Sequence, residues 1–474
     1  MPGMPPGEGA RTGWRGMDAR QRRVLGSTLS ANALVFFEQT AVILALPAIR
    51  REFGAPASEL QWVVTAYLLA LAVFMLVAGR VADHVGRRRT FLAGLVVFAA
   101  GSMLCAVAPG LPWLIAFRFL QGIGGAIVQP LALEVTTRAV RADQRGWAIG
   151  ALAAGGTSFL VFGPLIAGVL LAASWRWIFI AALPVAALSL GLGFPAIAPS
   201  RAEIRRPISW QSIALLLIGL GAFVFGLVSG EQLGIRTVIP ILGGLCVLVL
   251  FVRRQLRMPD PLIDVGLLYH PMLATCLAAI FAIQFAVLGV MFYLALYLQH
   301  RLGLTGIAAG AVIAVAGIGT PLLSMPAGRV ADRKGPRWLV LPGLVLATAA
   351  LVVLGVLAPL GGVLILLPGL IMFAVARPAI FTPAGIGPFL AVSGQQRAFA
   401  ASLITESRQL GAVLGVAFTT AVGVAVHGAS LTEHDPALGR GFRAAALAAA
   451  MVCALAAVVT WRWMPRQKQQ AGRR

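Results

Sequence analysis

Charged residues are scarce in this chain. Of its 474 residues only 11% are charged, whereas 59% are hydrophobic. A soluble protein cannot bury so much apolar surface and still present a polar exterior to water. The scarcity of charge therefore excludes a soluble globular protein and predicts an integral membrane protein.

Side chains that bind cofactors and metals are also few and scattered. The four cysteines, at positions 105, 246, 276 and 453, lie in separate apolar stretches without metal-ligand spacing, so we interpret them as small packing residues. No phosphate-binding loop of the GxxxxGK[ST] type occurs, which argues against ATP as a driving force. Because the sequence also lacks a catalytic cluster, we expect neither an enzyme nor a cofactor or metal.

The positive charge that the chain does carry points away from nucleic acid. The formal net charge is +22, and basic proteins often bind phosphate backbones. Here, however, the basic residues fall in short clusters between apolar runs, as the positive-inside rule predicts for membrane proteins. We therefore expect the lipid bilayer, and no nucleic acid, as a partner.

Apolar runs of about 20 residues, long enough to cross ~30 Å of hydrocarbon as helices, recur along the chain. With both termini placed in the cytoplasm, basic residues on the inner side outnumber those on the outer side by roughly four to one, and Arg377 and Arg397 count as inner. This bias predicts a multi-pass topology with both termini cytoplasmic. The fourteen runs are 24–49, 58–79, 90–109, 111–134, 147–173, 176–196, 208–230, 236–252, 271–299, 304–327, 338–358, 361–383, 398–427 and 444–464.

A six-residue phrase that occurs twice indicates an internal duplication. Ala78-Gly79-Arg80-Val81-Ala82-Asp83 and Ala327-Gly328-Arg329-Val330-Ala331-Asp332 are identical, and each ends the second span of a proposed half. Duplicated hydrophobic halves are typical of transporters. Each half then holds six spans, and spans 7 and 8 are an insertion. The predicted parts are a tail (1–23), an N-terminal six-helix bundle (24–197), a linker with spans 7 and 8 (198–270), a C-terminal six-helix bundle (271–464) and a second tail (465–474).

Acidic residues inside the spans are candidates for chemistry, because a carboxylate in hydrocarbon is costly and must face a cavity or a partner. Apolar surroundings favour a protonated carboxyl and a nearby arginine favours a charged one. A carboxyl that alternates between the two can carry a proton. Glu38 is our first candidate for this carrier or for a contact to a cationic substrate; the alternative is a static ion pair between spans 1 and 4.

Three further residues extend this candidate site. Arg118, permanently charged in span 4, would tune the carrier or serve as a hydrogen-bond donor between helices. Glu406 and Arg408 are two positions apart, so they point about 200° away from each other and should not pair. Glu406 is a candidate second proton or substrate site, or alternatively a residue of inter-helix packing.

The loop after the first copy of the phrase is a candidate gate. Gly79 would allow close helix approach, Gly86 a tight turn with positive φ, and Asp83 would face a helix N-terminus in the other half. Arg87 could pair with Glu134. Contacts that form in one conformation and break in the other would bias alternating access; the alternative is positive-inside topology alone.

The remaining candidate gate residues lie in both copies of the loop. Arg88 completes the basic loop of the first copy, and Asp332 and Arg333 stand in the second. The second copy continues with Gly335-Pro336-Arg337, where the first has Gly86-Arg87-Arg88. We therefore expect the first loop to dominate the gate.

These motifs resemble a known family. The loop Gly79-x-x-x-Asp83-x-x-Gly86-Arg87-Arg88, in a duplicated six-helix bundle, resembles the signature loop of the major facilitator superfamily. Further stretches are similar to its fourteen-span drug–proton antiporters: Arg118-Phe-Leu-Gln121-Gly122-Ile-Gly124-Gly125, Gly163-Pro164-Leu-Ile-Ala-Gly168, Trp175-Arg176-Trp177-Ile-Phe179 and Arg408-Gln409-Leu-Gly411. Span 1 departs from the family, with Glu38 in place of Asp and Ile43 in place of Asn, which leaves the substrate open.

The resemblance implies a fold, an activity and residue roles. The fold would be the all-α major facilitator fold, two six-helix bundles plus two extra spans. The activity would be proton-driven export of amphipathic or cationic drugs by alternating access, by a monomer in a bacterial inner membrane. Glu38 would partner Arg118, and the span 5 motif of Gly163, Pro164 and Gly168 would close the leak path.

Other functions stay open on the same fold. The chain could export one specific metabolite or antibiotic, import a substrate with protons, or not transport at all. An apolar substrate cavity could be lined by aromatic and methionine side chains of spans 1, 2 and 9. These are Phe36, Phe37, Trp62, Tyr67, Met291, Phe292 and Tyr293.

Overall fold

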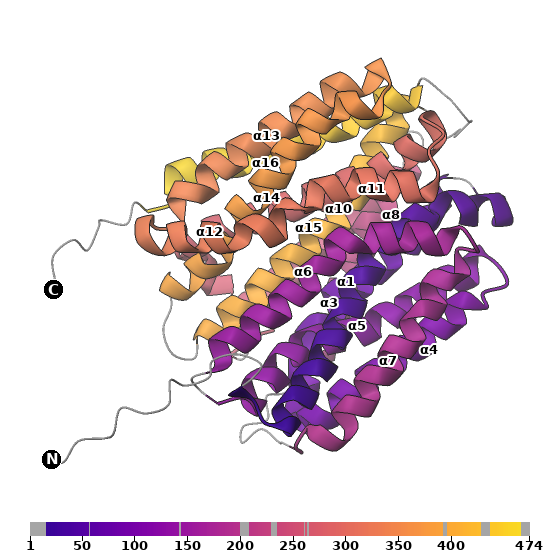
Figure 1. Ribbon diagram of the computed structural model, residues 1–474. Coiled ribbons are helices and arrows are strands. Elements are labelled where there is room, and N and C mark those ends of the chain that lie inside the picture. Colours follow the sequence, from indigo (N-terminus) through magenta and orange to yellow (C-terminus); the bar gives the residue numbers. More distant parts are fainter. Residues whose placement is uncertain are drawn as a thin grey trace, which may run out of the picture.

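All regular structure in the described part of the chain is helical (Figure 1). This computed structural model describes residues 16–465, apart from 56, 142–143, 200–207, 229–234, 260, 263–264, 392–395 and 428–436. Thirteen helical segments in it are long and apolar enough to cross a membrane, and α6, with 27 residues, makes fourteen. The predicted all-α membrane protein with fourteen spans is confirmed.

The N-terminal half begins earlier than the apolar pattern indicates. Asp18 caps the first helix by accepting a hydrogen bond from the backbone of Gln21, so the helix starts at Ala19, inside the predicted tail of 1–23. Residues 1–15 lie outside the described part. The helices are α1 (Ala19–Phe53), α2 (Ala57–Leu60), α3 (Trp62–Val85), α4 (Arg87–Ala106), α5 (Leu111–Ala139), α6 (Arg145–Leu171) and α7 (Arg176–Ala196).

In the described residues the C-terminal half has six membrane-crossing units, of which one is extended by a turn of another helix type and one is interrupted. A π-helical turn, η4, extends the first unit, and a break at Ile318 divides the second into α11 and α12. The predicted tail of 465–474 lies outside the described residues from 466 on. The elements are α10 (Pro271–Leu296), η4 (Tyr297–Arg301), α11 (Gly306–Gly317), α12 (Gly319–Lys334), α13 (Arg337–Leu357), η5 (Ala358–Leu360), α14 (Val363–Ala391), α15 (Gln396–His427) and α16 (Ala437–Trp463).

Two helices separate the halves in sequence, as the spacing of the repeat predicts. They are α8 (Trp210–Val228) and α9 (Ile235–Arg257), followed by the short η3 (Val265–Tyr269). They pack on each other, and α8 also contacts α3 of the first half and α15 of the second. At this contact the ring of Trp62 lies 6.1 Å from that of Phe225. The inserted pair therefore covers one seam between the halves.

The duplication is visible in the backbone. Gly86 (φ 105°) and Gly335 (φ 86°) each end a helix in a conformation that favours glycine. The amide of Gly86 donates to the carbonyl of Ala82 at 2.9 Å, and that of Gly335 donates to Ala331 at 2.8 Å. The two copies of the repeated phrase therefore build the same turn.

The two halves lie side by side with their helices roughly parallel, indigo to magenta in one and orange to yellow in the other (Figure 1). We call the end of the bundle that carries Ala19, Gly86, Gly335 and Trp463 the termini end, and the opposite one the far end. Contact between the halves runs mainly through α6 with α11 and through α15 with α3. The space between them is where a transporter of two halves binds its substrate.

Candidate functional site

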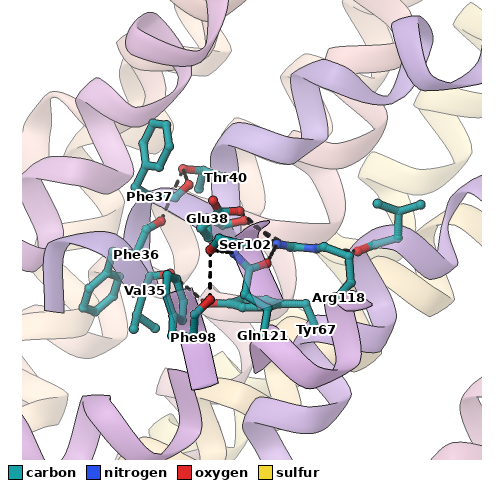
Figure 2. A network of polar contacts seen from close by, with 11 residues as sticks. Val35, Phe36, Phe37, Glu38, Thr40, Tyr67, Phe98, Ser102, Arg118 and Gln121 are labelled. Carbon is teal, nitrogen blue, oxygen red and sulfur yellow. Dashed lines mark hydrogen bonds and ion pairs between the residues drawn. The ribbon is translucent and has the colours of Figure 1, made fainter. Parts of the chain in front are cut away.

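A buried ion pair joins α1 and α5 within the N-terminal half (Figure 2). Nη1 of Arg118 donates to Oε2 of Glu38 at 2.9 Å. The arginine is 1% exposed and the glutamate 0%. A desolvated pair of this kind needs further hydrogen bonds to offset the loss of hydration.

Arg118 has those further bonds. Its Nε donates to the carbonyl of Val63 at 3.0 Å, and Nη2 donates to the backbone carbonyl of Glu38 at 3.3 Å. Nη1 also donates to the Gln121 side chain. The Tyr67 ring lies 4.2 Å from the guanidinium, close enough for a cation–π contact. The arginine is therefore held on all sides.

The local sequence brings α4 and α5 close enough for this network. A Cβ on Gly101 would lie 2.7 Å from the Cα of Gln121, so only glycine allows the observed approach. At this contact the Gln121 amide donates to Ser102 Oγ at 2.7 Å, and Ser102 donates to the Phe98 carbonyl at 3.0 Å. The glycines after Gln121 also serve helix packing, since a Cβ on Gly124 would collide with α4.

Unlike Arg118, Glu38 has a side-chain oxygen that accepts no hydrogen bond. Its Oε1 is buried without a hydrogen-bond partner, whereas Oε2 is bound to Arg118. A carboxyl that loses its ion-pair partner in an apolar site favours proton uptake. The geometry therefore suits a carboxyl group that pairs with Arg118 in one conformation and binds a proton in another.

Glu406 and Arg408 do not form an ion pair, in agreement with their spacing. Both carboxylate oxygens of Glu406 are buried without a partner, and the residue is 3% exposed. The Arg408 guanidinium instead lies 5.1 Å from the centre of the Phe36 ring on α1. One position on, Gln409 donates to Gln129 of α5 at 3.0 Å. This stretch of α15 therefore faces the N-terminal half.

The first gate loop forms an ion-pair cluster. Arg87 donates to Asp83 at 2.9 Å and also to Glu134, so it joins the end of α3 to α5. Arg88 donates to the Phe194 carbonyl at the end of α7, at 2.7 Å. The predicted contact of Asp83 with a helix N-terminus of the other half stays a prediction.

One expectation for this loop is wrong in the observed conformation. Gly79 was expected to allow close helix packing, but a Cβ there would meet no atom within 4 Å. The residue is exposed on an open face of α3, although its neighbours Ala78 and Arg80 are buried. Its glycine has no packing role that the structure explains.

The second gate loop keeps the turn without the ion pairs. Asp332 and Arg333 are exposed, and neither has an ion pair within the described chain. Pro336 replaces the arginine of the first loop, and a Cβ on Gly387 would lie 3.5 Å from its ring. Arg337 bonds the carbonyls of Trp461 and Met464 at the end of α16, as Arg88 bonds the end of α7.

A cavity lies between the halves, and it is nearly closed. The space within it that is open to water is about 30 Å³, enough for only a few water molecules, whereas drug-sized ligands occupy roughly 300–1,000 Å³. Substrate binding therefore requires the halves to move apart. The wall consists of Thr40, Ile43, Leu44, Pro164, Val287, Leu288, Met291, Ile313, Ala316, Gly317, Phe373 and Arg377.

Most of the aromatic side chains predicted to line a cavity lie elsewhere. Met291 is on the wall, but Tyr67 packs on Arg118 and Trp62 on Phe225. The ring of Tyr293 is buried, 6.3 Å from that of Phe442. Phe36, Phe37 and Phe292 are also buried but are not among the wall residues. An apolar span does not reveal which of its faces points inward, because lipid and protein core are both apolar.

Arg377 is a cavity residue whose position differs from the one predicted from the sequence. It was counted among the basic residues of the inner side, but it lies at the centre of α14, about 21 Å from either helix end at 1.5 Å per residue. The helix runs to Ala391, eight residues past the predicted end of the span at 383. The sequence did contain a signal for this placement, because position 377 falls inside the predicted span 361–383.

The span 5 motif lies where α6 meets two other helices. A Cβ on Gly163 would lie 2.8 Å from Thr40 Oγ1 of α1, and one on Gly168 would lie 2.7 Å from the Gly306 carbonyl oxygen of α11. The carbonyl of Pro164 abuts Gly310 of α11 in the same way. These contacts, with a hydrogen bond from Gln299 to the Leu44 carbonyl at 3.3 Å, close the far end.

Gly168→Leu should hold the far end open. Real Cβ atoms essentially never approach a carbonyl oxygen to 2.7 Å, so a leucine must separate α6 from α11. We expect a cysteine placed at Leu44 to react about tenfold faster with a membrane-impermeant thiol reagent, as a bias of ~1.4 kcal/mol would give. Gly150→Leu on the same helix meets open space and is the matched control. If the cysteine at position 44 reacts at the same rate with and without Gly168→Leu, the leucine does not separate α6 from α11 and the prediction is wrong.

No metal site accompanies these groups. Within the described residues, no three His, Cys, Asp or Glu side chains gather closely enough to hold a metal ion.

The fold and these contacts define a class of protein: a multi-pass helical transporter built from two six-helix halves around a central cavity. The chain belongs to the Major Facilitator Superfamily, whose family model matches residues 28–383 and 274–474. The resemblance found in the sequence motifs is thereby confirmed.

Similar proteins support the same assignment. The chain is 30% identical over 424 residues to the multidrug resistance protein B homolog of Mycobacterium tuberculosis, covering 87% of this chain and 78% of that protein. It is 31% identical over 470 residues to the puromycin resistance protein pur8 of Streptomyces alboniger, covering 94% and 92%. The crystal structure of a D-xylose-proton symporter matches with a TM-score of 0.67 at 17% identity, covering 94% and 98%, which shows the shared fold.

Proposed function

We propose that this protein exports amphipathic toxic compounds, antibiotics included, in exchange for protons across a bacterial cell membrane. The observation that carries the proposal is the buried pair of Glu38 and Arg118, in which one carboxylate oxygen has no partner. The relatives named for multidrug resistance support the class of substrate.

The coupling step follows from the pair. With Arg118 in place the carboxylate of Glu38 is charged; a rearrangement that withdraws the arginine favours proton binding in the same apolar site. Rocking of the halves then exposes the cavity at one end or the other, and the cluster of Asp83, Arg87 and Glu134 biases which end opens. Glu406 is a second candidate for proton binding in this scheme.

The orientation and working unit belong to the same proposal. The excess of basic residues on one side supports cytoplasmic termini, which makes the termini end the inner one. A monomer contains both halves and the cavity, so we propose that it functions alone, with the proton gradient as its driving force and no cofactor.

A dedicated exporter of one antibiotic is the second candidate. It is favoured by the match to the puromycin resistance protein over 94% of this chain. Sensitivity of a deletion strain to many unrelated compounds would support the broad exporter. Loss of resistance to one compound alone would support the dedicated one.

The direct test uses the purified protein in liposomes with an imposed pH gradient. We expect flux of several amphipathic compounds that reverses when the gradient is reversed and stops when an ionophore dissipates it. Flux that ignores the gradient would refute proton coupling, and gradient-driven flux of a single compound would favour the dedicated exporter.

A further inference from the structure

Arg377 is a charged side chain at the wall of the central cavity. It lies at the middle of α14, it is 7% exposed, and its neighbours on the wall come from α1, α6, α10 and α11. Ionisable residues at this depth of a membrane protein face cavities or partners, because burial of a lone charge is costly.

Among the described residues, no protein group forms a hydrogen bond or ion pair with this arginine. Within the described chain Arg377 has no hydrogen bond or ion pair, whereas Arg118, which is also buried, bonds Glu38, Gln121 and the carbonyl of Val63. Removal of a guanidinium from water without replacement of its hydrogen bonds is strongly unfavourable. A partner that enters and leaves the cavity would offset that cost.

The rest of the wall indicates the chemistry of the partner. Among the described residues of the wall, Thr40 alone has a polar side chain besides Arg377. Its hydroxyl lies 3.3 Å from the Phe37 carbonyl of its own helix, a bond that uses its hydrogen. No carboxylate of the described part of the chain lines the cavity, and Glu38 is not among the wall residues. The wall therefore offers one cationic donor, and besides it one hydroxyl oxygen that can accept, on a surface that is otherwise apolar.

We propose that Arg377 binds an acidic group, a carboxylate above all, on an amphipathic substrate whose apolar body packs against the wall. A guanidinium presents paired donors that match the two oxygens of a carboxylate. The inference rests on the proposed export function and narrows its substrate class: anionic or zwitterionic compounds are favoured, and compounds with positive charge alone are repelled by the arginine.

The test compares two probes that differ by one carboxylate, dansyl-phenylalanine and its methyl ester. Binding to the purified full chain is followed by dansyl fluorescence. We expect the acid to bind the unmodified protein about 10- to 100-fold more tightly than the ester, the range for a hydrogen bond to a charged group. Arg377→Gln should remove this preference and leave ester binding within about twofold.

Two further variants separate recognition from folding. Arg377→Lys keeps the positive charge but lacks the paired donors of the guanidinium, so it should retain part of the preference for the acid over the ester. Arg257→Gln, at the exposed end of α9, should retain all of it. Equal or undetectable binding of both probes to the unmodified protein, or an equal loss of both on Arg377→Gln, would overturn the proposal.

A transport arm distinguishes this inference from the proposed function. Gradient-driven flux of both probes without preference for the acid would refute the role of Arg377 alone. Preferential binding of the acid without gradient-driven flux of any compound would refute proton-coupled export and leave the binding site standing.

Discussion

Glu38→Gln should abolish transport driven by a pH gradient while leaving exchange of substrate across the membrane at equal pH. Glutamine keeps the size and the hydrogen bond to Arg118 but cannot take up or release a proton. Gradient-driven flux should fall by about 100-fold or more, the scale on which loss of a positioned proton-transfer group acts. The half-bundles should still rock, because the helix contacts at the far end do not involve this side chain.

Flux into liposomes, measured with and without an imposed pH gradient, separates gradient-driven transport from exchange at equal pH. Glu59→Gln is a matched control, since Glu59 is exposed in the short helix α2. Glu406→Gln, a buried carboxyl with no partner, shows whether the second glutamate shares the role. Intact proton-driven flux in Glu38→Gln would reduce the pair to a static link between α1 and α5.

Part of this site can be predicted from the sequence, because motifs record local chemistry. Arg118 inside an apolar span needs an acid, and Glu38 is one of very few within the spans. The pairing of Arg87 with Glu134 was likewise suggested by charges near one membrane face, and the structure contains it. The repeated phrase predicted two related halves, and both copies build the same glycine turn.

The cavity could not be predicted in the same way. Its wall depends on the rotation of each helix, and a helix with lipid on one side and apolar neighbours on the other has no polar face to mark it. Tyr67 was therefore expected at the cavity and lies against Arg118 instead. Arg377 was misplaced because α14 is longer than its apolar run indicated, so the residue lies at the centre of the helix.

Arg118→Met should destabilise the protein strongly, and loss of its partner's charge should restore most of the stability. Removal of one member of a buried ion pair leaves the other charge unpaired, at a cost of about 3–5 kcal/mol. In the double variant Glu38→Gln, Arg118→Met neither charge remains, and buried pairs replaced by neutral groups often lose little. Gradient-driven transport should be absent from both variants, because the single variant has no arginine to return the Glu38 carboxyl to its charged form and the double variant has no group to carry the proton.

Thermal unfolding in detergent measures this with a thiol-reactive dye, because Cys105, Cys276 and Cys453 are buried in the folded protein. A Cys246→Ser background removes the exposed thiol, and Arg257→Met is the matched control. The single variant should unfold several degrees below the double one. If both unfold at the same low temperature, the stability contributed by Arg118 comes from its bonds to Val63 and Gln121 and its contact with Tyr67, and the charge of Glu38 adds nothing. That result would also argue against the proposed proton coupling, which requires the charges of Glu38 and Arg118 to interact.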